Sequence, residues 1–448
     1  MVNFPTLKAT QTKTFPISDT AKFKQQALLW ANQFDTLCYL DSNEYHHDTY
    51  STCEALVAVS AVRELTVTHT GKGGFEQLKD LVNTRKSWLF GFLTYDLKND
   101  IEQLESRNSD GIGMPVLHFF QPKYVIQIFD KKVVIHSDEN DSEDIFYQIK
   151  NTSINFDLNK KTNITVQARI PKNEYLNIVE KIRQHIIEGD LYEMNFCQEF
   201  YAENTDIEPL AMFFRLNELS KAPFSSFYKK NNQYLLCASP ERFLKKQGQQ
   251  LISQPIKGTI RRGSTAAEDA ELQAILRSST KDRAENVMIV DLVRNDLTRS
   301  SRTGTIRVEE LFGIYPFEQV NHMISTVIST LRENVHAVDA IRNAFPMGSM
   351  TGAPKVMSMQ LIEQYEQTRR GLYSGAVGYF TPEGDFDFNV VIRSMLYNAS
   401  SRYLSFQVGG AIVYDSVPER EYEECLLKAK AMLETVDGGQ QTDATLDD

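Results

Sequence analysis

Two short pairs of acids and a lysine are the residues whose spacing points most directly to chemistry. Asp282 and Glu285 are three residues apart; Glu421 and Glu424 repeat that spacing, and Lys428 follows four residues later. Residues three, four or seven apart share one face of a helix, so each pair presents two carboxylates on the same side. Carboxylate oxygens are ligands that Mg²⁺ prefers. The spacing is typical of a divalent-cation site, but acids that complement a helix dipole explain it equally well.

A lysine at the end of a predicted strand is a second candidate. A hairpin turning at residues 247–248 would bring Lys257 level with about Ser239, beside Glu241. An amine next to a carboxylate can act as a nucleophile with a general acid or base at hand. A lone lysine at a strand end is usually solvated, so this segment by itself leaves both interpretations open.

Strands near the C-terminus supply positive charge and bare backbone for an anionic substrate. Arg393 shares a strand face with the apolar Val391 and Met395, which indicates an inward guanidinium with a carboxylate partner. Gly409 and Gly410 on the next strand let a ligand approach backbone N–H groups. A buried ion pair and a β-bulge are the ordinary explanations of these two features.

Helices and short antiparallel strands must position these residues. Apolar residues at a 3.6-residue period predict a helix over 173–188 that ends at Gly189. Three predicted strands, at 375–380, 386–396 and 403–413, are separated by the turn sequences TPEGD and NASS. Short turns between successive strands imply an antiparallel meander, so the predicted fold class is α+β.

Composition narrows the classes of function. The chain has 448 residues and a formal net charge of −11, from 48 Lys and Arg against 59 Asp and Glu, which disfavours general nucleic-acid binding. No apolar run reaches the roughly 20 residues that span a bilayer, and the polar N-terminus lacks the core of a signal peptide. The five scattered cysteines form no CxxC pair, which suits a reducing compartment. We therefore expect a cytoplasmic protein that binds neither nucleic acid nor membrane.

An acidic and Asn/Lys-rich stretch at 137–163 indicates an exposed connection. It separates an N-terminal region over 1–160 from a C-terminal region over 165–435, which carries every candidate named so far. The polar residues 436–448 are expected to form a flexible tail.

Ten segments of the chain, taken in order, resemble the chorismate-utilising enzymes. They are EGDLYEMNFCQEF, ASPERFL, PIKGT, KDRAENVMIVDLVRNDL, VNHMISTV, FPMGSMTGAPK, YSGAVGYF, VVIRS, VGGAIVYDS and EYEECLLKAK. The resemblance is strong over about 170–435 and weaker over 35–60. It implies two large, mostly antiparallel β-sheets packed face to face and flanked by helices, with chorismate between them and Mg²⁺ on its ring carboxylate.

The same resemblance implies roles for individual residues. The Mg²⁺ would be held by Glu285 and Glu424, with Asp282 and Glu421 close behind. The enolpyruvyl carboxylate would be bound by Arg393, Tyr373, Lys428 and the backbone of Gly409 and Gly410. The ring and its departing hydroxyl would be near Ser349 and His322, and catalysis would involve Lys257, Glu241 and His322.

Position 257 distinguishes branches of this family. The anthranilate synthase branch typically reads PIAGT, whereas PIKGT here is similar to the aminodeoxychorismate synthase component I branch. That resemblance implies Mg²⁺-dependent conversion of chorismate and ammonia to 4-amino-4-deoxychorismate, for para-aminobenzoate and folate synthesis, through a covalent Lys257 intermediate. We expect burial beside Mg²⁺ and Arg393 to lower the pKa of Lys257. An anthranilate synthase component I that carries Lys257, and a non-catalytic chorismate-binding relative, are the alternatives.

Two further expectations concern partners. None of the cysteines lies in the glycine elbow of a glutamine-hydrolysing thiol, so ammonia is expected from a separate glutamine amidotransferase subunit. The segments LDSNEYHHDTYSTCEAL and APFSS resemble parts of a tryptophan pocket. Its residues would be Ser42, Tyr50, Ser51, Pro223, Phe224 and Ser225. A core hairpin without a ligand is the equal alternative.

Overall fold

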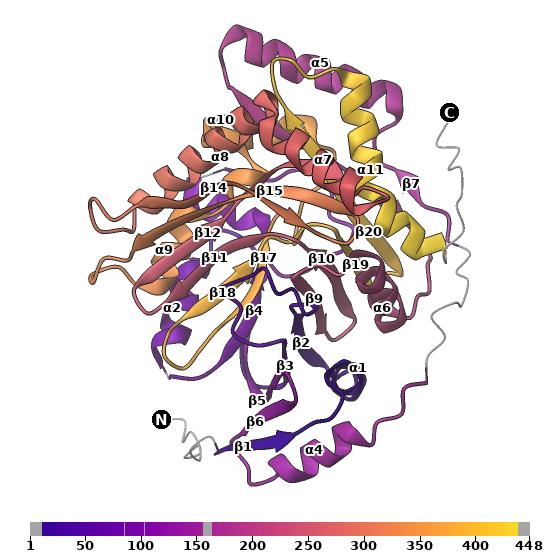
Figure 1. Cartoon of the computed structure of the whole chain (residues 1–448), viewed down its shortest axis with the longest axis vertical. Coiled ribbons are helices and arrows are strands. Elements are labelled where there is room, and N and C mark those ends of the chain that lie inside the picture. The colour runs from indigo at the N-terminus through magenta and orange to yellow at the C-terminus, as the bar shows by residue number, and fades with distance from the viewer. Residues whose placement is uncertain (1–10, 85, 103, 156–163, 438–448) are drawn as a thin grey trace.

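The computed structural model describes residues 11–84, 86–102, 104–155 and 164–437. Its strands form one antiparallel hydrogen-bonded network that folds into two layers (Figure 1). The first layer runs, in order of pairing, through β1 (Gln11–Pro16), β6 (Lys132–Ser137), β5 (Leu117–Phe129), β3 (Ala55–Val67), β2 (Thr36–Asp41), β9 (Phe224–Lys230), β10 (Gln233–Ser239), β19 (Ser394–Asn398), β20 (Tyr403–Ile412) and β8 (Glu193–Ala202). Two short strands, β7 (Gln167–Ala168) and β16 (Gly352–Ala353), also pair with β8.

The second layer begins on the same long strand β5. It continues through β4 (Leu89–Leu93), β17 (Ala376–Phe380), β18 (Phe386–Asn389), β11 (Arg242–Gln247), β12 (Gln250–Gln254) and β15 (Val320–Thr330). Strand β15 then pairs with β13 (Ile256–Arg261) and β14 (Arg307–Pro316). The strand β5 is therefore common to both layers.

Aromatic side chains fill the space between the two layers. Tyr228 on β9 lies with its ring centroid 5.1 Å from that of Phe92 on β4 and 6.2 Å from that of Phe120 on β5. The Tyr228 hydroxyl also lies 2.7 Å from Nδ1 of His118. This face-to-face packing of antiparallel sheets confirms the predicted α+β fold.

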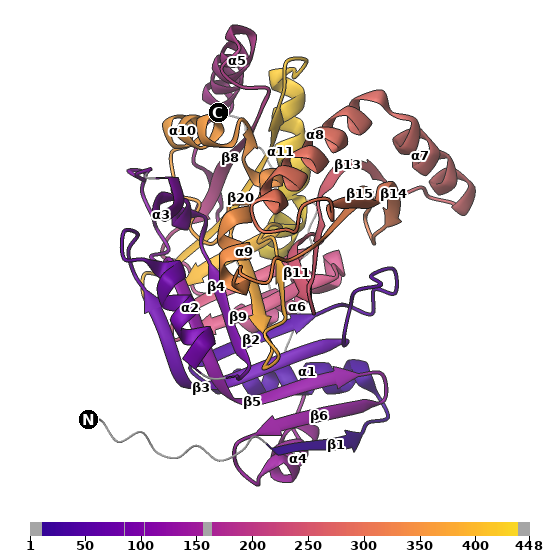
Figure 2. The same ribbon diagram turned by 90° about the vertical axis from the view of Figure 1, so that its left-hand side faces the viewer.

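Helices cover the outer faces of the layers. The first layer packs against α1 (Thr20–Ala31), α4 (Ser142–Lys150), α5 (Lys172–Glu188), α6 (Pro209–Ser220), α10 (Lys355–Tyr365) and α11 (Pro418–Asp437). The second packs against α2 (Gly74–Thr84), α8 (Thr280–Thr298) and α9 (Ala337–Ala344). The remaining helices are α7 (Ala266–Ser278), α3 (Lys98–Glu102) and the 3-10 turns Tyr95–Leu97 and Gly348–Met350. In Figure 2, α5 lies at one end of the molecule and β1, β6 and α4 lie at the other.

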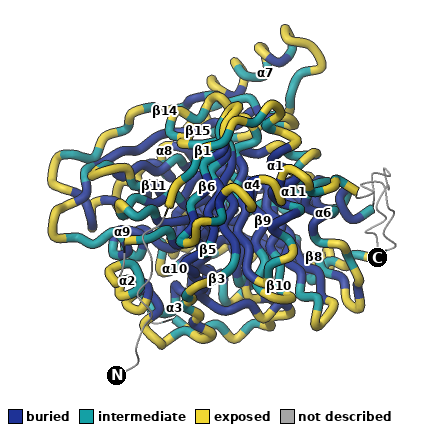
Figure 3. The backbone as a smooth tube through the Cα atoms, turned by 90° about the horizontal axis from the view of Figure 1, so that it is seen from below, coloured by how far each residue is buried: buried dark blue, intermediate teal, exposed yellow. Residues whose placement is uncertain are grey.

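The chain is buried most deeply along its strands (Figure 3). Helix α7 projects away from this body and buries only Asp269 and Leu276. None of the helices in the described part of the chain is long and apolar enough to cross a membrane.

The helix predicted over 173–188 is confirmed as α5, and Gly189 ends it in the left-handed conformation with a φ of 89°. The strand predicted over 386–396 is wrong, because it is two strands that lie in different layers. β18 pairs within the second layer and β19 within the first, and the chain crosses between them at 390–393. The predicted meander is therefore two hairpins, β17–β18 and β19–β20, that do not pair with each other.

The two sequence regions share both layers. The N-terminal strands β2 and β4 pair with β9 and β17 from the C-terminal region. The boundary placed near residue 160 lies outside the described residues. Of the predicted tail, residues 438–448 also lie outside the described residues, whereas Val436 is buried as part of α11.

Candidate active site

Two crossings between the layers meet at one place and bring together residues that are far apart in the sequence. The chain passes from β10 to β11 through Glu241, and returns from β18 to β19 through Arg393. The crossings are hydrogen-bonded to each other, since the Ala238 N–H donates to the Arg393 carbonyl at 3.0 Å and the Val390 N–H to the Glu241 carbonyl at 3.0 Å. The backbones of the two crossings are therefore fixed side by side, with Arg393 opposite Ala238 and Glu241 opposite Val390.

Lys257 forms a close ion pair inside the protein. Its Nζ on β13 donates to Oε1 of Glu193 at 2.6 Å, and both side chains are at least nine-tenths buried. Asn286 of α8 donates to the Lys257 carbonyl at 3.2 Å, which holds the strand against the helix. The second oxygen of Glu193, Oε2, is buried and has no hydrogen-bond partner among the described residues.

Glu193 is a residue that the sequence interpretation missed. It lies in LYEMNF, where the period-two pattern directs attention to the apolar residues on either side. The available signal was a carboxylate inside a strand that is otherwise buried, because burying an unpaired charge is costly and calls for a partner.

The electrostatic surroundings of Lys257 differ from those expected. Burial lowers the pKa of Lys257, but the carboxylates of Glu193, Glu285 and Glu424 outweigh burial, so its pKa is raised above the ordinary value. The expected lowering by Arg393 is thus not found, and the resting form of Lys257 is the ammonium ion.

Glu241 is suited to exchange a proton near neutral pH. Its side chain accepts a hydrogen bond from the Ser349 hydroxyl at 2.6 Å. Burial raises the pKa of Glu241 to about 7, although the Ser349 hydroxyl and the charge of Lys257 act in the opposite direction. The Ser349 carbonyl accepts a hydrogen bond from Asn195 of β8, so the 3-10 turn is tied to the strand that carries Glu193.

His322 lies on β15 opposite Thr259, two residues beyond Lys257. Its Nδ1 is 2.9 Å from the Thr259 hydroxyl, and its ring packs edge-on against Phe317. Burial and the charges of Arg393 and Lys428 lower the pKa of His322 to about 3. The imidazole is therefore neutral at pH 7.

Arg393 and Lys428 provide the positive charge. Nη1 of Arg393 donates to the Lys428 carbonyl at 3.2 Å, and burial lowers the pKa of Arg393. Arg393 has a φ of 51° at the crossing, so the predicted strand face with Val391 and Met395 is wrong. Among the described residues no carboxylate forms an ion pair with this guanidinium, although the charge of Glu424 acts to raise its pKa. A half-buried guanidinium without such an ion pair is suited to bind an anion.

Tyr373 is buried in the same region. Its hydroxyl lies 3.5 Å from Sγ of Cys197, on the strand β8 that also carries Glu193. The Lys428 ammonium donates to the Gly409 carbonyl at 2.8 Å, so in this structure the Gly409 carbonyl, and not its N–H, faces this side chain.

The four acids proposed as metal ligands lie on the two helices as predicted, with lysines among them. Glu424 accepts from Lys428 at 2.7 Å, and this neighbour lowers the pKa of Glu424. Burial raises the pKa of both Glu285 and Glu421. Asp282 accepts a hydrogen bond from the Ser279 hydroxyl at the start of α8.

The donor set of these helices fits Mg²⁺, since it consists of carboxylate oxygens. A Cβ atom at Gly410 would lie 3.4 Å from Oε2 of Glu421 and 3.6 Å from Oε1 of Glu424, so the glycine leaves space beside these oxygens. No three of these four described acids place their carboxylate oxygens within 4.8 Å of one another. Among the described residues, the group of three ligand atoms within 4.8 Å of one another is the exposed cluster of His185, Glu188 and Asp190.

Five of the six residues predicted for tryptophan binding surround one cavity of about 70 Å³. They are Ser42, Ser51, Pro223, Phe224 and Ser225. Tyr50 does not line it, because its hydroxyl donates to Glu309 on β14. Arg242 also lines this cavity, and its guanidinium lies over the Phe224 ring and is paired with Asp48 and Asp387.

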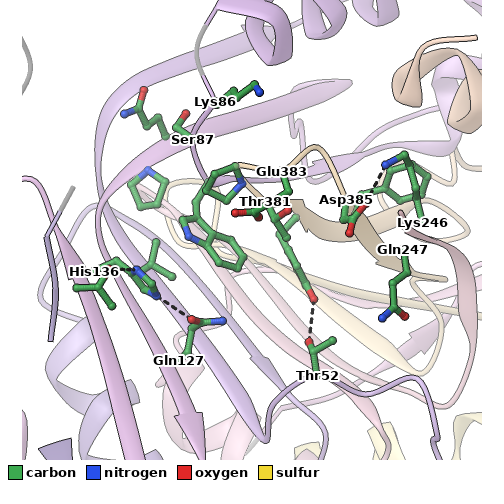
Figure 4. A pocket seen from close by; sticks show the side chains of 18 of the residues that line it. Thr52, Lys86, Ser87, Gln127, His136, Lys246, Gln247, Thr381, Glu383 and Asp385 are labelled. Carbon is green, nitrogen blue, oxygen red and sulfur yellow. Dashed lines mark hydrogen bonds and ion pairs between the residues drawn. The ribbon is translucent and has the colours of Figure 1, made fainter. Parts of the chain in front are cut away.

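A larger pocket of about 610 Å³ (Figure 4) adjoins this cavity, and Thr52 and Tyr379 line both. The Tyr379 hydroxyl is 3.5 Å from that of Thr52. His136 and Gln127 face each other across one wall, with Nε2 of the histidine 2.7 Å from the amide oxygen. None of the proposed catalytic residues lines this pocket.

Comparisons with known proteins identify the family of the chain. The family model described as chorismate binding enzyme matches residues 20–434. Aminodeoxychorismate synthase component 1 of Bacillus subtilis (strain 168) is 33% identical over 356 residues, 76% of this chain and 75% of that protein. The anthranilate synthase component I-like protein of Synechocystis sp. is 33% identical over 362 residues, 78% of this chain and 73% of that protein. The structure of anthranilate synthase component I from Streptococcus pneumoniae TIGR4 has a TM-score of 0.74 at 26% identity and covers 87% of this chain and 95% of that one. Because the family match extends over nearly all of the sequence, this chain belongs to the chorismate binding enzymes.

Proposed function

We propose that this chain converts chorismate and ammonia into 4-amino-4-deoxychorismate, as component I of an aminodeoxychorismate synthase, for para-aminobenzoate and folate synthesis. The observation that carries the proposal is Lys257, buried and ion-paired at 2.6 Å to Glu193, with Glu241 nearby. When a nucleophile and an acid or base act on the same ring, one difficult substitution is divided into two easier displacements. In the first, the amine attacks ring carbon 2 and the hydroxyl leaves carbon 4; in the second, ammonia adds at carbon 4 and the lysine leaves.

Each remaining residue has a role that its surroundings support. Glu241, with a pKa of about 7, donates a proton to the departing hydroxyl and later accepts one from the added ammonia. Arg393, Lys428 and Tyr373 bind the enolpyruvyl carboxylate, because two of them are cations and the half-buried guanidinium forms no ion pair with any described residue. Neutral His322 and Ser349 orient the ring.

Mg²⁺ is proposed as the cofactor, held by Glu285 and Glu424 with Asp282 and Glu421 behind them. It would neutralise the ring carboxylate of chorismate. The support is the carboxylate donor set and the space that Gly410 leaves beside it.

A separate glutamine amidotransferase is proposed as the source of ammonia, and the cytoplasm as the location. All five cysteines of the chain are free thiols, a state that suits a reducing compartment. Burial raises the pKa of Cys197 to about 11 and that of Cys237 to about 12. Such thiols do not supply the thiolate that glutamine hydrolysis needs.

Anthranilate synthesis is the second candidate, because relatives at the same level of identity are named for it. Product identification decides between the two. The purified chain is incubated with chorismate, Mg²⁺ and ammonium, and the products are separated by mass and absorbance. Aminodeoxychorismate supports the proposal, whereas anthranilate as the main product contradicts it, and the lack of any chorismate-derived product favours the non-catalytic alternative.

The cavity lined by the predicted tryptophan-binding residues is small. The cavity of about 70 Å³ is well below the roughly 300 Å³ of small-molecule pockets. We therefore expect the core-hairpin alternative, and no rise in melting temperature with L-tryptophan; a saturable rise that is lost in Ser42→Ala would restore the tryptophan pocket.

A further inference from the structure

Within the covalent route through Lys257 proposed above, we infer that Glu193 is the catalytic base that takes the proton of the Lys257 ammonium and so releases the nucleophile. The acceptor atom, Oε1, is 2.6 Å from Nζ, within the 2.6–3.2 Å reach of a general base. Glu193 thus touches the reacting atom directly, which Glu241 does not do in this structure.

The backbone of Glu193 is held in place, while its side chain is engaged by Lys257. The Ser358 hydroxyl donates to the Glu193 carbonyl at 3.2 Å, and β16 pairs with this end of β8 at Ala353. Among the described residues, Lys257 is the single hydrogen-bond donor to the side chain, and its Oε2 is buried with none. The carboxylate is therefore directed at the nucleophile and at no other described donor.

The neighbouring carboxylates are less suited to the task. Glu241 already accepts from Ser349 and serves the leaving hydroxyl. Glu285 and Glu424 face lysines on their own helices, with Lys281 at 3.8 Å from Glu285 and Lys428 at 2.7 Å from Glu424. Within the described part of the chain, the side-chain partner of Glu193 is the nucleophile alone.

The protons balance over one cycle. The ammonium of Lys257 gives one proton to Glu193, and the lone pair of the resulting amine forms the bond to ring carbon 2. The ring double bonds shift and the bond from carbon 4 to the hydroxyl breaks, while Glu241 protonates the hydroxyl to water. Ammonia then bonds to carbon 4, the double bonds shift back, and Lys257 leaves with its electron pair as a neutral amine. Glu193 returns its proton to that amine, and Glu241 recovers one from the new ammonium group.

The experiment measures how fast Lys257 becomes covalently modified in a single turnover. Intact mass follows the adduct after chorismate and Mg²⁺ are mixed with the full chain in the absence of ammonia. Glu193→Gln keeps the size and the hydrogen bond but cannot take the proton. We expect it to slow adduct formation about 100-fold or more, the lower part of the range for general base catalysis. Glu203→Gln, which removes an exposed carboxylate just after the same strand, is the matched control and is expected to react at the wild-type rate.

A second variant separates proton transfer from a structural role. Glu193→Ala leaves space for a small anion beside Lys257. Formate is expected to restore the adduct rate by 10-fold or more. Nitrate, a planar anion of similar size that is not a base, is expected to restore nothing. Equal rescue by nitrate would mean that only charge or position matters and would overturn the inference, and so would a lack of rescue by formate.

The wild-type protein distinguishes this inference from the function on which it rests. Without an adduct on wild-type Lys257, the covalent route fails and Glu193 loses its role with it. If wild type forms the adduct and Glu193→Gln forms it equally fast, only the assignment of Glu193 is wrong. If Glu193→Gln does not fold, as seen by circular dichroism, the comparison of formate with nitrate in Glu193→Ala decides.

Discussion

At the scale of single residues, the candidate site contains carboxylates that differ in burial. This difference shifts their pKa values in opposite directions and suits them to different roles. Glu241 is 4% exposed, and burial raises its pKa to about 7 against the opposing effects of two neutral hydrogen-bond donors, the Ser349 hydroxyl and the Ile256 backbone, and of the Lys257 charge. Glu424 is about half exposed and accepts from an ammonium group, so its pKa falls. One acid is therefore suited to carry a proton at neutral pH, while the other stays ionised and available to a cation.

The raised pKa of Glu241 predicts how stability depends on pH. Between about pH 4.5 and about pH 7 the native state holds a proton that the unfolded state has lost, so the free energy of unfolding falls as pH rises. The full effect is about 3 kcal/mol, from 1.36 kcal/mol per pKa unit. Urea unfolding of wild type and Glu241→Gln across this range should show the two stabilities diverge, with wild type losing more. Parallel curves would show that the pKa of Glu241 is not raised.

Glu424 gives a second prediction at this scale. Glu424→Gln should lower Mg²⁺-stimulated turnover at least 100-fold, because the amide is a poor ligand for the cation. The melting temperature should change little, since this exposed ion pair with Lys428 contributes at most about 1 kcal/mol. Glu423→Gln, at the exposed neighbouring position, is the control for helix α11. Full turnover of Glu424→Gln in the presence of a chelator would refute the metal assignment.

At the scale of elements, the strand β20 carries two adjacent glycines for different reasons. A Cβ at Gly409 would lie 2.0 Å from the Phe196 carbonyl on β8, so the strands could not remain paired at that distance. A Cβ at Gly410 meets Glu421, Glu424 and Lys428 only at 3.4 Å or more, which is ordinary contact. The first glycine is needed for the sheet and the second for the site.

Alanine substitutions separate these two requirements. Gly409→Ala should lower the free energy of unfolding by about 1–3 kcal/mol or more through overpacking. Gly410→Ala should fold with nearly wild-type stability and bind Mg²⁺ and chorismate more weakly, because the added methyl group occupies the space beside the acids. Chemical unfolding and calorimetric titration measure the two effects. A stable Gly409→Ala protein, or one with Gly410→Ala and unchanged affinity for both ligands, would contradict this division.

At the scale of the whole molecule, the two layers bring the proposed catalytic groups together and bury most of the thiols. Four of the five cysteines are buried, and burial raises the pKa of Cys53, the remaining one, to about 12. Thiols with such raised pKa values do not supply the thiolate that cysteine-dependent glutamine hydrolysis needs.

The single chain should therefore form product from ammonium salts and none from glutamine. Turnover is measured with each nitrogen source, and glutamate release is measured in parallel. Product formation with glutamine should appear only when a glutamine amidotransferase subunit is added. Glutamate released by the purified chain alone would show that one of its own thiols is active.

Much of the site follows from local patterns in the sequence. Helical spacing alone assigns Asp282 and Glu285 to one helix face and Glu421 and Glu424 to another, because the period of a helix is a local property. The same holds for the helix that ends at Gly189 and for the hairpin that precedes Lys257. Ordered motifs also identify the family, since each motif records the chemistry of a short segment.

The tertiary structure determined which residues that are distant in the sequence contact one another. No local pattern indicates that the chain changes layers at Arg393 or that this crossing is hydrogen-bonded to the one at Glu241, because both depend on pairings with distant strands. The partner of Lys257 was undetermined for the same reason: Glu193 is 64 residues away and reaches it only once β8 and β13 belong to different layers. The raised pKa of Lys257 follows from that assembly, since the balance between burial and three carboxylates exists only in the folded molecule.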